Sequence, residues 1–260
     1  MRSIRTTTAL LALSALLGAG LAGADEWDVG NDTDNALTTD NSLFHGAEQV
    51  HDLGALSPGV ADQDWYLISG RNFSSYQFVV DGVTGDLDLD GTDVQRTTSD
   101  GIPSEDGLVT DSGSQVTINL MVGSAGDNYV RVQGAACGSS CTSQARYRMR
   151  FYDTTYTIPR FNNSGTQSTV LLVVNASDRT CTGFYEFFQN DGTRVLDRQF
   201  LLSPAQLDVF PLASEAQLAG VSGSIRILHT CGYGGLSGKA VSLEPSTGFT
   251  FETPLVHRPR

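Results

Sequence analysis

The chain has 260 residues, of which 40% are hydrophobic and 17% are charged. This apolar content is enough for one or two folded domains and argues against a fully disordered chain. Acidic residues outnumber basic ones by 29 to 16, the formal net charge is −13, and Lys239 is the only lysine. Binding to a phosphate backbone needs clustered cations, so nucleic acid is excluded as an expected partner.

Residues 1–24 have the composition of a secretory signal peptide. Arg2 and Arg5 precede an apolar run that ends in the small residues 22–24, which suit a signal peptidase. The run is short, rich in Ala and Gly and followed at once by Asp25 and Glu26, so a retained membrane anchor is the weaker interpretation. No second stretch is long enough to cross a bilayer. We expect a secreted or periplasmic mature chain, 25–260, whose net charge changes from −13 to −15 when the two arginines are removed.

An exported chain favours disulfides over free thiols and metal sites. Cys137 and Cys141 bracket a small polar loop, whereas Cys181 and Cys231 lie far apart in the sequence. One local pair and one long-range pair form the simplest of the three possible connectivities. Zinc would need a tighter set of ligands, and the nearest histidines are distant from the cysteine pair 137–141.

Apolar residues at every second position predict strands along most of the mature chain. In the first half these patterns lie at 65–68, 76–80, 116–122 and 147–151. In the second half the predicted strands are 170–174, 184–188, 200–202, 225–228 and 249–251. Asn190, Asp191 and Gly192 predict a hairpin turn between two of them, and 214–218 is the best helix candidate but is short.

The predicted boundary between two domains lies at 153–159, where one strand series closes on Phe151 and the next opens after Pro159. Each half is long enough for a sandwich of about seven or eight strands. A single continuous β-domain is the alternative, but a separate cysteine pair in each half favours two cores. We therefore predict an all-β protein with two consecutive β-sandwich domains of jelly-roll or immunoglobulin-like type, at 25–153 and 154–260.

The first half contains an ordered series of short motifs. They are the acidic start at 28–33, Gly54-Ala55-Leu56, the aromatic strand at 62–68, the acidic strand at 85–89, the strand at 127–132 and the closing strand at 147–151. In this order, residues 26–153 resemble the bacterial pre-peptidase C-terminal domain. The resemblance implies a β-sandwich appended to secreted proteins, often hydrolases, where it is removed or binds a substrate or surface. Nothing in 154–260 resembles a peptidase.

Some members of that family bind calcium through the acidic start and the acidic residue before the aromatic strand. Carried over by position, the resemblance implies a calcium site formed by Asp28, Asn31, Asp32, Asp62 and Asp64. Here Val29 and Gly30 stand where the family has another acidic ligand. The alternative is that residues 31–33 cap a turn and that Asp64 begins a strand.

A second acidic cluster lies at 86–93 and matches the opening of a calcium loop. The match fails at the twelfth position, where Thr97 replaces the bidentate glutamate. Because Leu87 and Leu89 alternate with the acidic residues, a strand with a solvated acidic face is the preferred interpretation.

The residues give no catalytic signature. His45, His51, His229 and His257 are the four histidines, and none belongs to a Gly-x-Ser-x-Gly or His-Glu-x-x-His motif. We interpret His45 and His51 as surface residues that could also pair on a metal. His229 shares the parity of the apolar strand at 225–228, so it is expected to be a packed, hydrogen-bonded core residue.

Arg146, Arg148 and Arg150 share one face of the strand at 147–151 and form a cationic stripe in an acidic chain. Such a stripe either meets an anionic polymer or pairs with acidic residues across the sheet. The second half, 154–260, is similar in outline to bacterial immunoglobulin-like sandwiches through generic features only.

These observations predict a secreted, non-enzymatic binding or adhesion module that recognises an extracellular polymer, surface or protein, with a first domain ordered by calcium if the acidic start binds it. One alternative is a hydrolase, or a hydrolase accessory protein, that uses carboxylates. The other is a structural component of an envelope or matrix.

Overall fold

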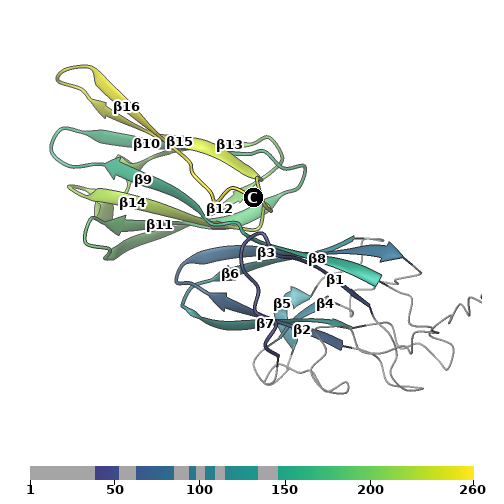
Figure 1. The fold of residues 1–260 in the computed structure, drawn as a ribbon. Coiled ribbons are helices and arrows are strands. Elements are labelled where there is room, and N and C mark those ends of the chain that lie inside the picture. The colour runs from purple at the N-terminus through teal and green to yellow at the C-terminus, as the bar shows by residue number, and fades with distance from the viewer. Residues whose placement is uncertain (1–38, 53–62, 85–93, 98–102, 109–114, 134–145) are drawn as a thin grey trace, which may run out of the picture.

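The computed structural model describes residues 39–52, 63–84, 94–97, 103–108, 115–133 and 146–260 (Figure 1). This part of the chain is built from antiparallel strands and two single-turn 3-10 helices, Leu212–Ser214 (η1) and Ala216–Leu218 (η2). The predicted all-β class is confirmed. Within the same residues, no helix is long and apolar enough to span a membrane.

The first half forms two four-stranded sheets, in the orders β1-β8-β3-β6 and β2-β7-β4-β5. The strands are β1 (Glu48–Asp52), β2 (Gln63–Gly70), β3 (Ser74–Thr84), β4 (Val94–Thr97), β5 (Pro103–Leu108), β6 (Gln115–Val122), β7 (Gly126–Gln133) and β8 (Arg146–Asp153). Alternate residues of both sheets, such as Phe78 and Met149 from one and Ile68 and Val132 from the other, share one buried cluster. Two sheets that bury their apolar faces against each other are the arrangement of a β-sandwich.

The second half repeats this plan with different strand orders, β12-β11-β14-β9 and β13-β10-β15-β16. Its strands are β9 (Tyr156–Asn162), β10 (Ser168–Asn175), β11 (Cys181–Gln189), β12 (Arg194–Leu202), β13 (Leu207–Pro211), β14 (Ser222–His229), β15 (Leu236–Glu244) and β16 (Phe249–Pro254). A second buried cluster, which includes Phe161, Val173, Phe187 and Ile225, fills the space between the sheets. All five strands predicted in this half are present, and residues 190–192 form the turn between β11 and β12.

The first strand of the second half, β9, begins earlier than the sequence predicts. The prediction placed Pro159 before the next strand, but β9 begins at Tyr156 and runs through the proline. Proline cannot donate to a sheet ladder, so it is tolerated in strands at edges and bulges. Both conditions hold here, because β9 is an edge strand and its pairing with β14 shifts register beside Pro159, between Gly223 and Ile225.

The predicted long-range disulfide is present. It joins Cys181 at the start of β11 to Cys231, two residues beyond the end of β14. Cys137 and Cys141 lie outside the described residues, as does the acidic cluster at 86–93.

Only Thr154 and Thr155 separate β8 from β9, and both are buried. They are bonded to Ser75 of β3: the Thr154 amide donates to the Ser75 carbonyl at 2.8 Å, and the Ser75 amide donates to the Thr155 hydroxyl at 2.9 Å. Figure 1 shows the β1-β8-β3-β6 sheet on the side of the first half that faces the second. We call the boundary between residues 39–153 and 156–260 the seam.

Candidate functional site

The residues predicted to bind calcium are only partly described. Asp28, Asn31, Asp32 and Asp62 lie outside the described residues. Asp64 is the second residue of β2 and is buried, with 3% of its surface exposed. Its carboxylate accepts a hydrogen bond of 2.5 Å from the Tyr147 hydroxyl of β8, and Nδ1 of His51 lies 3.8 Å away. Asp64 thus connects the two sheets of the first half.

Aromatic rings surround this carboxylate. The Tyr147 hydroxyl lies 2.5 Å from the Tyr66 hydroxyl, and the His51 ring stacks on Tyr147 with 5.4 Å between ring centroids. Burial and the neighbouring Asp64 charge raise the pKa of Tyr147 well above its ordinary value, so its proton stays in place as a donor. The cluster has the composition of a buried network that fixes the fold.

Calcium binding at Asp64 stays a prediction, because the other four expected ligands lie outside the described residues. Calcium takes about six to eight oxygen ligands, mostly carboxylates and carbonyls. The partners of Asp64 given above are a phenol and an imidazole. Across the described ranges, moreover, no three His, Cys, Asp or Glu side chains are grouped so that they could hold a metal ion.

Two of the histidine predictions have different outcomes. The interpretation of His51 as a surface residue is wrong, because β1 pairs with β8 and places His51 opposite Tyr147 in the interior. The prediction for His229 is confirmed. Its ring is enclosed; the Cys231 amide donates to Nδ1 at 3.1 Å, and Nε2 therefore carries the proton and donates to the Thr154 carbonyl at 2.8 Å. Burial lowers the pKa of His229 to about 4, so it is a neutral link across the seam.

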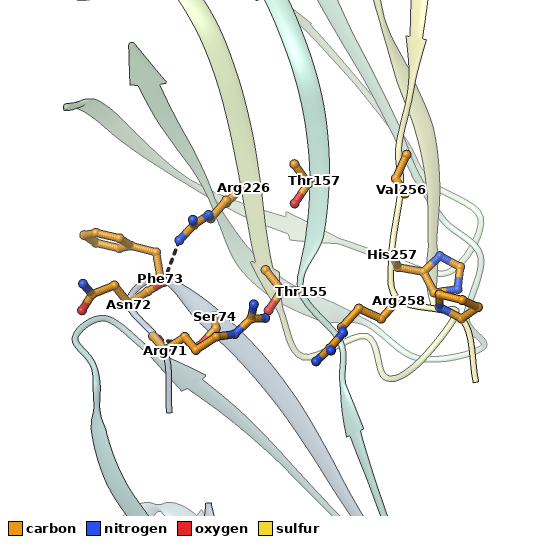
Figure 2. Close-up of a pocket in the computed structure, with 11 residues that line it drawn as sticks. Arg71, Asn72, Phe73, Ser74, Thr155, Thr157, Arg226, Val256, His257 and Arg258 are labelled. Atoms are coloured by element: carbon orange, nitrogen blue, oxygen red, sulfur yellow. Dashed lines mark hydrogen bonds between the residues drawn. The ribbon is translucent and has the colours of Figure 1, made fainter. Parts of the chain in front are cut away.

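A hollow of about 440 Å³ opens on the seam (Figure 2). Its walls come from the turn between β2 and β3, the start of β9, strand β14 and the segment after β16. Arg71, Arg226 and Arg258 line it, and Figure 2 shows Arg71 and Arg258 extending toward each other from separate walls. We call it the arginine hollow.

Positive charge exceeds negative charge in the arginine hollow. The buried carboxylate of Asp153 accepts a hydrogen bond from Arg71 and lies 3.6 Å from Nη1 of Arg258. Arg226 donates to the backbone carbonyl of Asn72 at 2.9 Å, a partner without a formal charge. Among the described residues of this hollow, three guanidinium groups and one carboxylate leave two net positive charges, in a chain whose total is −13.

A second hollow, of about 470 Å³, opens on the seam over the outward face of β3 and β6. Gln77, Thr117 and Asn119 form its floor, and the segments 177–180 and 230–233 beside the disulfide form a wall. Charged side chains line it as well, namely Arg150, Asp178, Arg179 and Arg260. We call it the polar hollow, because amide, hydroxyl and charged groups from both halves line it.

Several contacts fix the lining of the polar hollow. The Tyr233 amide donates to the Gln77 side chain at 3.1 Å, and the Tyr152 and Tyr233 rings lie 5.0 Å apart. The guanidinium of Arg260 lies 4.5 Å from one ring centroid and 4.7 Å from the other. Gly232 has φ +81, and a Cβ there would lie 2.7 Å from the Gln77 amide nitrogen, so glycine is required at this close approach.

One residue of the predicted arginine stripe, Arg150, lines the polar hollow, and two of the three arginines are paired with acidic residues. Arg148 pairs with Glu48 at 3.6 Å and Arg150 pairs with Asp81, so cross-strand pairing, the second of the two interpretations, applies to both residues. The sequence analysis missed Arg71, Arg226 and Arg258, which belong to three segments distant in sequence. No local spacing pattern connects them, and only the folded seam places them in one hollow.

Comparisons with known proteins add no functional assignment. No family model and no curated protein matches the chain. Among solved structures, it resembles a β-glucuronidase of Bacteroides uniformis with 11% identity over 76% of this chain and a TM-score of 0.22. A β-glucuronidase from glycoside hydrolase family 2 matches with 12% identity over 85% of this chain and a TM-score of 0.20. This chain covers 26% of the length of each enzyme. TM-scores this low do not establish a shared fold or function.

Proposed function

We propose that this protein is a secreted or periplasmic, non-enzymatic binding module that holds an extracellular polymer along the seam between its two β-sandwich units. The observation that carries the proposal is the polar hollow, where both halves present hydrogen-bonding groups around an open groove. A ligand seated there would contact both units at once.

The lining of the polar hollow suits a polymer rich in hydroxyl groups. The amides of Gln77 and Asn119 each supply donors and an acceptor, and the Thr117 hydroxyl supplies both. Because Gln77 is already held by the Tyr233 amide, a ligand would not need to order it on binding. Groups fixed in advance lower the entropy cost of association.

Export and the absence of a catalytic step are parts of the same proposal. The disulfide between Cys181 and Cys231 and the signal-like segment 1–24 support export to an oxidising compartment. His51 and His229 are held in buried networks, which supports structural roles for them. The resemblance of 26–153 to a domain appended to secreted proteins supports a binding role.

The test is affinity electrophoresis of the oxidised protein through gels that contain individual soluble polysaccharides. The double variant Thr117→Val/Asn119→Leu keeps the side-chain size but removes the hydrogen-bonding groups from the floor of the polar hollow. We expect its affinity to fall about tenfold or more, since each lost hydrogen bond is worth about 1 kcal/mol. Thr250→Val, on the exposed strand β16, is the matched control. Equal retardation of the double variant and the control would contradict the proposal.

A further inference from the structure

We propose that the arginine hollow binds an anionic group of the polymer, which makes the ligand an acidic polysaccharide. This proposal rests on the proposed function, in which the ligand is a polymer. The arginine hollow adds that the polymer carries negative charge. The segment after β16 takes part in both hollows: Arg258 lines the arginine hollow and Arg260 lines the polar hollow. The proposal is that one extended ligand follows this segment and contacts both.

The charge balance of the arginine hollow is the first argument. Asp153 is 2% exposed and shares its carboxylate between Arg71 and Arg258, so it neutralises one of these two cations. Its position beneath the surface prevents it from neutralising a third. Arg226 faces the same hollow with a backbone carbonyl and the Phe188 ring, 5.3 Å from its guanidinium carbon, as partners. Glu186 lies opposite Arg226 in the pairing of β11 with β14 but forms its ion pair with Arg194. Among the described residues, two positive charges of the arginine hollow therefore remain for a ligand.

The geometry of guanidinium groups is the second argument. Each presents a planar fork of N–H donors that matches the paired oxygens of a carboxylate or sulfate group. The hydrogen bonds from Arg71 to Asp153 and from Arg226 to Asn72 use only part of these donors. The exposed guanidiniums of Arg71 and Arg258, at 60% and 61% side-chain exposure, keep donors directed to the open space.

The acidity of the whole chain does not prevent this binding. The Debye length at physiological salt is about 8 Å, so acidic side chains farther away than this contribute little to the potential in the hollow. A ligand anion in contact with Arg226 and Arg258 is instead governed by charges within hydrogen-bonding distance. The attraction is local, whereas the repulsion is spread over the surface.

A polysaccharide fits the seam better than an acidic protein. Protein interfaces have an apolar, aromatic-rich centre from which water is removed. The polar hollow instead offers amides and hydroxyls from Gln77, Asn119 and Thr117, and its two tyrosine rings already contact Arg260. These groups suit the hydroxyls of a sugar chain whose acidic group lies in the arginine hollow.

Arg226→Gln is the most informative variant. Arg226 forms no ion pair among the described residues, so its replacement leaves the buried Asp153 charge compensated by Arg71. Arg160→Gln is the matched control: it removes the same charge from an exposed position on β9, and Arg160 lines neither hollow. Urea unfolding of both variants would verify that stability is preserved.

The assay is isothermal titration calorimetry with oligogalacturonate, dextran sulfate, neutral dextran and polyglutamate, each at low and high salt. We expect the two acidic sugars to bind in a salt-sensitive way, and Arg226→Gln to weaken them about tenfold, as for a lost charge-assisted hydrogen bond. Arg160→Gln should stay within about twofold of the unmodified protein. Equal affinities of the two variants for the acidic sugars would overturn the proposal.

The other outcomes of this experiment distinguish a failure of this proposal from a failure of the proposed function. Neutral dextran bound as tightly as the acidic sugars would overturn the anion site, while polymer binding itself would stand. Tighter binding of polyglutamate than of either sugar would overturn the polysaccharide class. No binding of any polymer, with Thr117→Val/Asn119→Leu equal to the unmodified protein, would refute the proposed function itself.

Discussion

Acidification should destabilise this protein through His229. The pKa of the imidazole is about 4 in the folded chain and 6.5 as the ordinary value, because burial disfavours the charged ring. Below the ordinary pKa the unfolded chain binds a proton that the folded chain does not bind, so the free energy of unfolding falls as the pH falls. Each pKa unit corresponds to about 1.4 kcal/mol, so the loss reaches about 3 kcal/mol once the pH is below about 4.

The hydrogen bonds explain why the folded chain resists protonation. Nδ1 of His229 accepts from the Cys231 amide at 3.1 Å, and a proton on Nδ1 would place two donors against each other. Urea unfolding from about pH 7 to about pH 4 would measure the effect. His229→Gln should be less stable than the unmodified protein at neutral pH, and the difference should shrink by about 3 kcal/mol on acidification. His45→Gln is the control with one histidine fewer, because His45 is not among the groups that shift the pKa of His229. If His229→Gln and the unmodified protein lose the same free energy over this range, the reasoning is refuted.

Three further variants test the interior. Tyr147→Phe removes the hydroxyl that donates to buried Asp64 and should lower the free energy of unfolding by about 1–3 kcal/mol, equally in calcium and in EDTA. A loss confined to calcium would instead support Asp64 as a calcium ligand. Replacing Cys181 and Cys231 by alanine opens a 50-residue loop and should lower the free energy of unfolding in urea by about 4 kcal/mol. An unchanged free energy of unfolding would show that the loop is constrained without the disulfide. Gly183→Ala would place Cβ 2.1 Å from a carbonyl oxygen of β14 and should cost more than about 2 kcal/mol; unchanged thermal unfolding would contradict this contact.

Much of the fold follows from alternation in the sequence. Tyr147, Met149 and Phe151 point inward from β8 while the arginines between them are more exposed, as period-two patterning predicts. The pattern fails on β1, where Val50 is 39% exposed and His51 is 1% exposed. A polar residue takes the inward position there because the aromatic network around it supplies hydrogen-bonding and stacking partners, which the sequence of one strand does not reveal.

The candidate site was less predictable than the fold for a physical reason. The bond from Arg226 to Asn72 joins residues 154 positions apart, and the contact between Tyr233 and Gln77 joins residues 156 apart. Neither contact is part of a strand ladder, of the hydrogen bonds within a turn or of a motif with fixed spacing in the sequence. Both depend on how the two halves dock, and docking is set by buried groups such as Thr154 that carry no functional signature.

The seam and the rest of the surface differ in the range over which their charges act. The chain has 29 acidic and 16 basic residues, so its net charge repels an acidic polymer. Salt readily screens this repulsion at distances beyond the Debye length. The arginine hollow attracts it only in contact, where screening is weak. Under the proposal, the acidic excess of the chain as a whole disfavours other orientations, which is how electrostatics contributes specificity more than affinity. A net negative protein is for this reason better suited to bind an acidic chain at one defined place than a basic protein, whose whole surface would compete with the site.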